Sequence, residues 1–455
     1  MIRIHFLGIL GTGMSSLGIY CQEKGYIVSG SDVKDINDTS IPAWINEVAY
    51  VNKIDHNLIN QANYIVYSTA IKQNHPELIY AKKQGKKILH RSEFIKIISK
   101  NNQVISIAGT HGKTTTSSLT AWVFSQNNQQ PSYLLGGIPI NLSSAKFDTG
   151  KQFILEADES DGSFLNYDTD ICVITNIEAD HLENHNNSFE NYLNAFKKFI
   201  SGCNICIFNF HDAYTNSIIN EINGTTFYSF GYDSRATFQI IDIIHKGSTQ
   251  LIQILAPDNQ TYAFETKLLG KYNAENAVAA WILGYLNKIE LIGLSNSISS
   301  FEGVKRRCEH IGQININQQL SIPVLDDYGH HPTECNAVIK EFKRQNKKII
   351  HIFQPHRYSR LTQFFDEFIE TLKESDVIII QDVYTAGEIK KDQKDSLSLV
   401  NTLDQIHPNV FHVNDSQNVV SIVNEFLDQN SVILFQGAGS ISQMAHECAK
   451  IWNQN

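Results

Sequence analysis

Short apolar runs recur along the chain, and most are followed by a turn and then by a stretch with helical periodicity. This alternation predicts parallel sheets covered by helices, which is the α/β class. The segment 228–264 instead alternates apolar with polar positions and predicts an antiparallel patch. The expected strands cover residues 2–7, 27–29, 64–67, 104–108, 153–155, 171–175, 205–210, 321–325, 348–353, 377–381 and 432–435, and the expected helices cover 14–24, 114–126 and 274–286.

Three such series follow one another along the 455 residues. At roughly 100–200 residues per domain, the length also predicts about three domains. A polar run at residues 100–103 separates the first series from the second, and the third begins near Gln313. We therefore expect domains over residues 1–100, 101–312 and 313–455, with Rossmann-like folds in the first and the last.

Composition and charge narrow the classes of partner. The net charge is −10 and the chain has no basic face, so nucleic-acid binding is not expected. No apolar run reaches the roughly 18 residues that a bilayer requires, and the N-terminus has the pattern of a strand, so we expect a cytoplasmic protein without membrane insertion. The seven scattered cysteines do not form a disulfide framework, and Cys203 and Cys206 are interpreted as buried thiols.

A phosphate-binding loop is predicted at Gly109-Thr110-His111-Gly112-Lys113-Thr114-Thr115, which follows an apolar run and opens a helix. Glycines let backbone N–H groups approach phosphate oxygens, and the helix N-terminus adds a positive dipole end. Lys113 is expected on the β- and γ-phosphates and Thr114 on Mg²⁺. Two residues rather than four separate Gly109 from Gly112, so a generic glycine turn is the alternative.

Acidic residues follow the expected strand at 153–155, at Glu156, Asp158, Glu159 and Asp161. The next strand leads to Asp180 and His181. Ligands bind at the carboxyl ends of strands in open α/β sheets, and carboxylate oxygens suit Mg²⁺. These residues therefore predict a metal site beside the phosphate loop, with a solvated acidic loop as the alternative.

A first glycine turn, Gly8-x-x-Gly11-x-Gly13, also follows a strand and opens a helix, and Asp32 lies beyond it. The spacing departs from the dinucleotide fingerprint, so an NAD(P)-binding Rossmann oxidoreductase is an alternative rather than the main interpretation. The helix N-terminus suits any diphosphate, including that of a UDP-sugar. An oxidoreductase would leave the second loop at Gly109 unexplained.

Cationic side chains gather near the third series of elements. The basic run at residues 305–307 contains Arg307, a candidate to neutralise charge on a transferring phosphoryl group, with a basic linker as the alternative. Arg357 and Arg360 follow a strand and are candidates for binding a carboxylate. Zinc is an alternative for His330 and His331, although adjacent residues lack standard ligand spacing.

Taken together, these strings resemble the Mur ligase family of bacterial cell-wall synthesis. Gly-Thr-His-Gly-Lys-Thr-Thr is typical of the family. Asp-Tyr-Gly-His-His-Pro-Thr-Glu (residues 327–334) and Gln-Pro-His-Arg-Tyr-Ser-Arg (354–360) resemble the members that join L-alanine to UDP-N-acetylmuramate. The resemblance implies an ATP-dependent, ADP-forming carboxylate–amine ligase of peptidoglycan synthesis, a process needed for cell shape and division. It also implies a monomer or weak homodimer.

The resemblance further implies a role for each domain: UDP-sugar binding, a P-loop-type ATPase centre, and amino-acid and nucleotide binding. Near the UDP-sugar it places Gly11, Gly13, Ser15, Asp32 and Ser68. Around ATP it places Gly109, Thr110, His111, Gly112, Lys113, Thr114, Thr115, Asn273, Asn276 and Asp327. Mg²⁺ is expected on Thr114, Glu156 and His181, and alanine near Arg357 and Arg360.

The implied chemistry is activation of the sugar's carboxylate as an acyl phosphate, which the amine of alanine then attacks. Lys113, His181, Arg307 and His331 are the expected catalytic residues, and His181, His330 or His331 is a candidate to take the amine proton. The nearest alternative is a recycling ligase that attaches a preformed murein peptide to the same sugar. A non-catalytic nucleotide-binding regulator is the third alternative.

Overall fold

The structure is a computed structural model that describes residues 1–35, 42–180, 182–317 and 320–454. The chain forms two compact units. The first comprises Met1–Leu269 with Asn273–Glu302, and the second comprises Gly270–Tyr272 with Gly303–Asn455. Among the described residues, no helix is long and apolar enough to cross a membrane.

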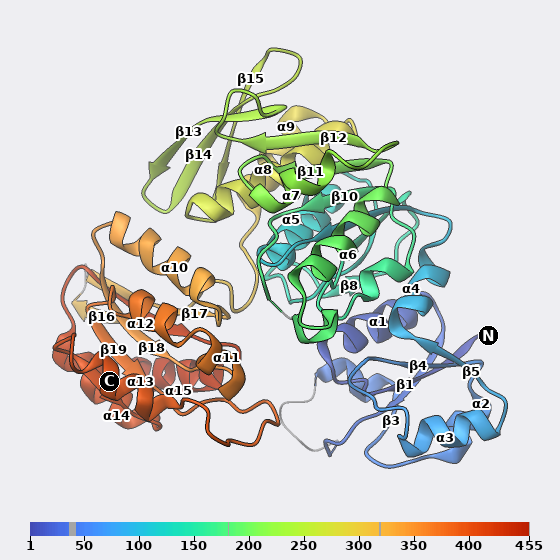
Figure 1. The fold of residues 1–455 in the computed structure, drawn as a ribbon, viewed down its shortest axis with the longest axis horizontal. Coiled ribbons are helices and arrows are strands. Elements are labelled where there is room, and N and C mark those ends of the chain that lie inside the picture. The colour runs from blue at the N-terminus through green and yellow to red at the C-terminus, as the bar shows by residue number, and fades with distance from the viewer. Residues whose placement is uncertain (36–41, 181, 318–319, 455) are drawn as a thin grey trace. The chain divides into compact units, whose positions relative to one another are not determined.

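A five-stranded parallel sheet begins the first unit (Figure 1). Its order is β3-β2-β1-β4-β5, with β1 (Arg3–Leu7) at the centre. The other strands are β2 (Ile27–Ser31), β3 (Ala49–Val51), β4 (Tyr64–Tyr67) and β5 (Lys87–His90), and the helices are α1 (Thr12–Glu23), α2 (His56–Gln61), α3 (Pro76–Lys83) and α4 (Arg91–Ser99). The strand order reverses at β1, so the β1–α1 turn lies where doubly wound sheets bind ligands. The expected Rossmann-like fold is confirmed.

The second sheet of this unit has ten strands, in the order β15-β14-β13-β12-β11-β10-β6-β9-β7-β8. At its centre β11 (Ile205–Asn209), β10 (Ile171–Ile174), β6 (Gln103–Ala108) and β9 (Gln152–Glu156) run parallel to one another. At one end β13 (Phe238–Lys246), β14 (Thr249–Leu255) and β15 (Thr261–Thr266) pair antiparallel, as the alternating pattern predicted. The remaining strands are β7 (Ser132–Leu134), β8 (Ala145–Lys146) and β12 (Thr226–Gly231).

Helices and aromatic side chains hold this sheet in place. The helices are α5 (Lys113–Gln126), α6 (Phe189–Ser201), α7 (Ala213–Ile219), α8 (Lys271–Leu286) and α9 (Leu291–Ser300). Trp281 of α8 packs edge-on to Phe238 and parallel to Phe264, so it anchors the antiparallel strands. One apolar cluster runs from Ile4 of the first sheet to residues of the second, including Phe153. This shared core explains why the two sheets form a single unit.

The second unit contains a six-stranded sheet with the order β16-β17-β21-β18-β19-β20. The edge strand β16 (Glu309–Asn317) is antiparallel to β17 (Leu320–Asp327), whereas β17, β21 (Ser431–Gln436), β18 (Lys348–Phe353), β19 (Val377–Ile380) and β20 (Val410–His412) are parallel. The helices are α10 (Pro332–Arg344), α11 (Tyr358–Gln363), α12 (Phe365–Leu372), α13 (Ser396–Leu403), α14 (Ser416–Phe426) and α15 (Ile441–Gln454). Parallel strands with intervening helices confirm the predicted Rossmann-like class.

Candidate active site

The phosphate loop connects β6 to α5, at the carboxyl edge of the ten-stranded sheet. Gly109 and Gly112 have φ values of +129° and +83°, which L-residues with a Cβ rarely adopt. Gly112 is the N-cap of α5 and has no side chain that could cap the first N–H groups of the helix. A Cβ on Gly112 would lie 2.6 Å from Asn276 Oδ1, so the loop is closed against α8.

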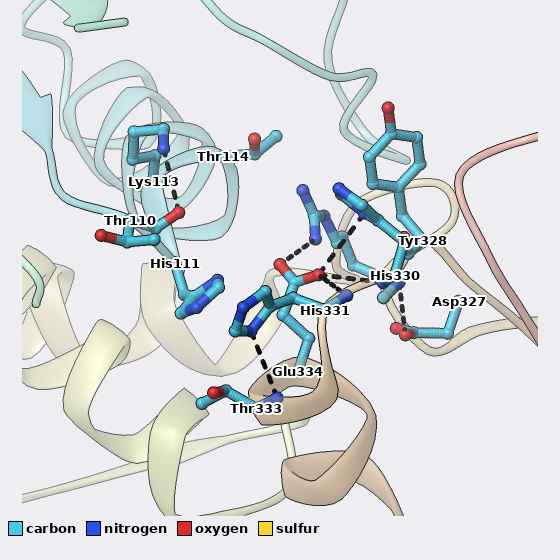
Figure 2. A network of polar contacts seen from close by, with 12 residues as sticks. Thr110, His111, Lys113, Thr114, Asp327, Tyr328, His330, His331, Thr333 and Glu334 are labelled. Atoms are coloured by element: carbon cyan, nitrogen blue, oxygen red, sulfur yellow. Dashed lines mark hydrogen bonds and ion pairs between the residues drawn. The ribbon is translucent and has the colours of Figure 1, made fainter. Parts of the chain in front are cut away.

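Lys113 lies at the start of α5 with its ammonium folded back over the loop (Figure 2). Its Nζ donates to the carbonyl oxygens of Gly109 at 2.6 Å and Thr110 at 3.1 Å, and it forms an ion pair with Glu159 Oε1 at 2.8 Å. Burial raises the pKa of Glu159 to about 7, although Lys113 opposes that shift. Burial works against the charge of Lys113, but the neighbouring carboxylates, Glu159 foremost, raise its pKa above the ordinary value.

Glu156 ends β9 and lies beside the hydroxyl of Thr114. Thr114 Oγ1 donates to Glu156 Oε1 at 3.1 Å, while Ser117 Oγ and the Gly136 N–H donate to Oε2 at 3.4 and 3.0 Å. A Cβ on Gly136 would lie only 2.1 Å from Glu156 Oε1. This carboxylate is therefore fixed by three donors next to the first turn of α5.

The loop that follows β10 is hydrogen-bonded to the phosphate loop. Thr110 N–H donates to Asn176 O at 2.9 Å, and His111 N–H donates to Asn176 Oδ1 at 2.9 Å. Glu178 N–H donates to Thr110 Oγ1 at 2.8 Å, and the Glu178 carboxylate lies 3.4 Å from His111 Nε2. His181, expected as a metal ligand and candidate base, lies outside the described residues.

The two asparagines of α8 are also brought to this loop. Thr116 Oγ1 donates to Asn276 Oδ1 at 3.1 Å, and Asn276 Nδ2 donates to Asn273 Oδ1 at 3.4 Å. Asn273 Nδ2 donates to Leu269 O at 2.9 Å. The chain of bonds links residues about 160 positions apart in sequence, and Thr115, 7% exposed, is packed within the same helix turn.

The first glycine turn is built around Asp32, at the carboxyl ends of β1 and β2. Asp32 Oδ2 accepts from Leu10 N–H at 3.0 Å, and Gly11 is the N-cap of α1 without a side-chain cap. Ser15 Oγ accepts from Trp44 Nε1 at 3.0 Å, and Ser68 O accepts from Ile71 N–H after β4. The structure thus groups Gly11, Ser15, Asp32 and Ser68 at adjacent strand ends.

Arg91 connects this turn to the acidic loop after β9. Its Nη2 lies 3.3 Å from Asp158 Oδ2. Its Nη1 lies against Gly13, and a Cβ added to Gly13 would be only 2.0 Å from this nitrogen. Thr69 Oγ1 donates to Asp161 Oδ2 at 2.5 Å. The carboxyl edges of the first and second sheets therefore meet within the first unit.

In the second unit, Asp327 organises the loop that follows β17. The residue is 5% exposed and accepts from Cys308 N–H at 3.0 Å, Gly329 N–H at 2.8 Å and Gln436 Nε2 at 2.7 Å. Arg306 reaches the next loop, donating to Gly437 O at 2.7 Å. The sequence predicted that Asp327 contacts the nucleotide. In the structure, both of its carboxylate oxygens accept hydrogen bonds from the protein.

His330 and His331 precede α10 and share Glu334 as a partner (Figure 2). Glu334 Oε2 accepts from the N–H groups of His330 at 3.0 Å and His331 at 3.4 Å, and His331 Nδ1 accepts from Thr333 N–H at 3.3 Å. Arg307 lies 3.8 Å from Glu334 Oε1 and over the ring of Tyr328. His331 therefore caps a helix.

Of the two arginines expected near alanine, Arg357 precedes α11 and Arg360 lies within it. Arg357 is its N-cap with a φ of +67°, a strained value for a residue with a Cβ. Arg360 is 8% exposed, and its Nη1 lies 3.5 Å from His356 Nδ1. The rings of His356 and His330 lie 5.4 Å apart. Burial lowers the pKa of His330 to about 3 and that of His356 to about 4, with nearby arginine charge acting in the same direction.

Sequence reasoning left several members of these groups without a role. Glu159 was part of the acidic run, but nothing in the spacing indicated which carboxylate meets Lys113. The sequence could not indicate the contacts of Ser117, Gly136 and Asn176, because these contacts depend on how β9 and β10 lie beside β6. Arg91 lay in an ordinary helix start, and only the fold brings it to Gly13.

The fold and these groups define an α/β protein with a glycine-rich loop between β6 and α5 and with carboxylates beside that loop. Models of protein families match three successive parts of the chain, and all three belong to one family. Residues 3–103 match the catalytic domain of the Mur ligase family, residues 107–284 match the Mur ligase middle domain, and residues 306–439 match the domain described as "Mur ligase, glutamate ligase domain". The chain belongs to the Mur ligase family.

Curated relatives match over nearly the full length. UDP-N-acetylmuramate–L-alanine ligase of Buchnera aphidicola subsp. Acyrthosiphon pisum (strain Tuc7) is 34% identical, over 98% of this chain and 94% of its own. The enzyme of the same name from Wigglesworthia glossinidia brevipalpis is 33% identical, over 97% and 95%.

Solved structures show the same fold. UDP-N-acetylmuramate-alanine ligase from Thermotoga maritima superposes with a TM-score of 0.83 at 24% identity, covering 100% of both chains. A murein peptide ligase from Psychrobacter arcticus 273-4 gives 0.70 at 20% identity, covering 100% and 99%. Family membership excludes the oxidoreductase and makes this chain an ATP-dependent ligase.

Proposed function

We propose that this Mur ligase joins L-alanine to the lactyl carboxylate of UDP-N-acetylmuramate, with conversion of ATP to ADP and phosphate, in peptidoglycan precursor synthesis. Its full-length curated relatives carry that activity in their names. The observation that carries the chemistry is the placement of Lys113, Thr114 and Glu156 around one phosphate loop. We assign UDP-sugar binding to residues 1–100, ATP binding to 101–312, and amino-acid and nucleotide binding to 313–455.

The donor set at the loop fits a magnesium ion. Thr114 Oγ1 and Glu156 Oε1 lie 3.1 Å apart, and both are hard oxygen donors of the kind that Mg²⁺ prefers. We assign these two residues, with His181, to metal binding. A bound Mg²⁺ would neutralise charge on the β- and γ-phosphates.

The residues of the loop would position the nucleotide. Backbone N–H groups at the start of α5 and the ammonium of Lys113 would bind its phosphates, and Asn273 and Asn276 lie on the neighbouring helix for its base. Arg307 would neutralise charge on the transferring phosphoryl group. Arg357 and Arg360 supply cations for the carboxylate of alanine.

Two displacements complete the reaction. A carboxylate oxygen of the sugar attacks the γ-phosphorus, the bond to the bridging oxygen of ADP breaks, and an acyl phosphate forms. The amine of alanine then attacks the acyl carbon, loses a proton, and inorganic phosphate leaves with the former carboxylate oxygen. The enzyme supplies positioning and charge neutralisation.

Phosphate release tests this proposal. ATP, Mg²⁺ and UDP-N-acetylmuramate would be combined with L-alanine, glycine, L-serine or a murein tripeptide in separate reactions. We expect release that needs both the sugar and L-alanine. Release with the tripeptide alone would assign the chain to the recycling ligases, and release without any amine would argue against a ligase.

A further inference from the structure

The ammonium of Lys113 already has a full set of acceptors from the protein. It donates to two carbonyls of its own loop and to Glu159 at 2.8 Å. An ammonium has three N–H donors, so each has an acceptor before any nucleotide arrives. A phosphate oxygen that takes this ammonium must therefore displace one of the three.

The carboxylate that ends β9 and the three that follow it have different partners. Glu156 accepts from Thr114 and Ser117, Asp158 lies beside Arg91, and Asp161 accepts from Thr69. Among the described residues, Glu159 is the carboxylate that forms an ion pair with Lys113. The structure therefore gives Glu159 a separate task from the proposed metal ligand Glu156.

Glu159 is buried, and its backbone is held in place. The residue is 2% exposed, its backbone carbonyl accepts from Gly162 N–H at 3.1 Å, and His185 Nε2 lies 3.1 Å from the same backbone oxygen. Removing one partner of a buried ion pair is costly, because the other charge is then left buried without compensation. A phosphate group must compete with this carboxylate for Lys113, since both are anions that accept from the same ammonium.

We propose that Glu159 is a positioning residue that holds Lys113 in the nucleotide-free enzyme and competes with the nucleotide's phosphates for its ammonium, which weakens nucleotide binding. The inference rests on the proposed assignment of Lys113 to ATP. After phosphoryl transfer, recapture of Lys113 by Glu159 loosens ADP, so the same contact favours product release.

The test is a double-mutant cycle on nucleotide affinity. Calorimetry would measure the Kd of the β,γ-imido analogue of ATP with Mg²⁺, for the wild type, Glu159→Gln, Lys113→Met and the double variant. Glutamine keeps the size and an acceptor oxygen but removes the charge. We expect Glu159→Gln to lower the Kd about three- to tenfold, and to have no effect when Lys113 is already methionine.

Asp168→Asn is the matched control, because it removes an acidic charge that pairs with Lys96 at the surface and does not touch the contacts of Lys113. It should leave the Kd within about twofold. Thermal unfolding of each variant would establish that it is folded. An unchanged or higher Kd in Glu159→Gln, or the same decrease without Lys113, would overturn the inference. Lys113→Met with wild-type affinity would instead overturn the proposed nucleotide site.

Discussion

Thr114 Oγ1 donates a hydrogen bond to Glu156 Oε1 at 3.1 Å and joins the first turn of α5 to the end of β9. The two residues are 42 positions apart in sequence. The pairing arises because β6 and β9 are parallel neighbours, so the elements that follow them emerge at one edge of the sheet. This relationship supports the assignment of both residues to one Mg²⁺ ion.

Replacing the carboxylate tests that assignment. Glu156→Gln keeps the acceptor for Thr114 but removes the charge that a divalent cation needs. We expect kcat for phosphate release to fall about 100-fold or more, which corresponds to roughly 3 kcal/mol of transition-state stabilisation. Excess Mg²⁺ should recover part of the loss, as titration of the metal would show. Wild-type activity with an unchanged Mg²⁺ requirement would place the metal elsewhere.

A methyl group at Gly136 should disturb the same carboxylate without changing any charge. Its Cβ would lie 2.1 Å from Glu156 Oε1, so the side chain must move away from Thr114. We expect Gly136→Ala to reduce kcat at least about tenfold. Gly202→Ala is the matched control, because its nearest contact is 3.4 Å and its φ is −84°, and it should retain full activity. Equal kcat in the two variants would contradict the account.

The second unit should lose stability in mild acid because it buries neutral histidines. Burial lowers the pKa of His351 to about 3, whereas an exposed histidine has a pKa near 6.5. The unfolded chain therefore binds the proton first, and the stabilisation present above about pH 6.5 is lost as the pH falls toward 3. For His351 this amounts to about 2 kcal/mol between pH 7 and pH 5.

Hydrogen exchange of the β18 amides at several pH values would measure this effect. His351→Gln cannot take up the proton and should lose about 2 kcal/mol less over the same interval. His412→Gln is a suitable control, since His412 lies at the carboxyl end of β20 beside Asp382, whose side chain is 71% exposed. Identical pH slopes for His351→Gln and the wild type would contradict the prediction.

Asp327 should contribute more to stability than an ordinary aspartate. The substitution Asp327→Asn would present an amide N–H toward donors that now meet a carboxylate, leaving at least one of the three without an acceptor. We expect it to lower the free energy of unfolding by about 2–4 kcal/mol, against less than about 0.5 kcal/mol for the exposed Asp382→Asn. Urea unfolding would measure both. A neutral Asp327→Asn would show that the loop does not depend on this charge.

Much of the fold follows from the sequence, and the reasons are local. The strands at 64–67 and 348–353 have the bounds that their apolar runs predict, because each run is buried and ends in polar residues. β3, β5 and β16 were not predicted. β3 and β5 are edge strands of short, mixed composition, and β16 alternates too weakly to separate it from a loop.

The candidate site could be predicted only as separate motifs. The sequence indicated the phosphate loop and Glu156, since glycines, lysine and carboxylates at strand ends have recognisable chemistry. It could not indicate that Lys113 meets Glu159 rather than Asp158 or Asp161, because a shift of one residue along a loop redirects a side chain. Nor could it show that His331 caps α10, since capping depends on backbone geometry.

The central claim is that a carboxylate is activated as an acyl phosphate and then joined to L-alanine. The most direct measurement uses UDP-N-acetylmuramate labelled with ¹⁸O in its lactyl carboxylate, with ATP, Mg²⁺ and L-alanine, followed by mass spectrometry of the phosphate and the sugar product. The account predicts one ¹⁸O atom in the released phosphate for each amide formed. Amide formation with unlabelled phosphate, or no amide at all, would contradict it.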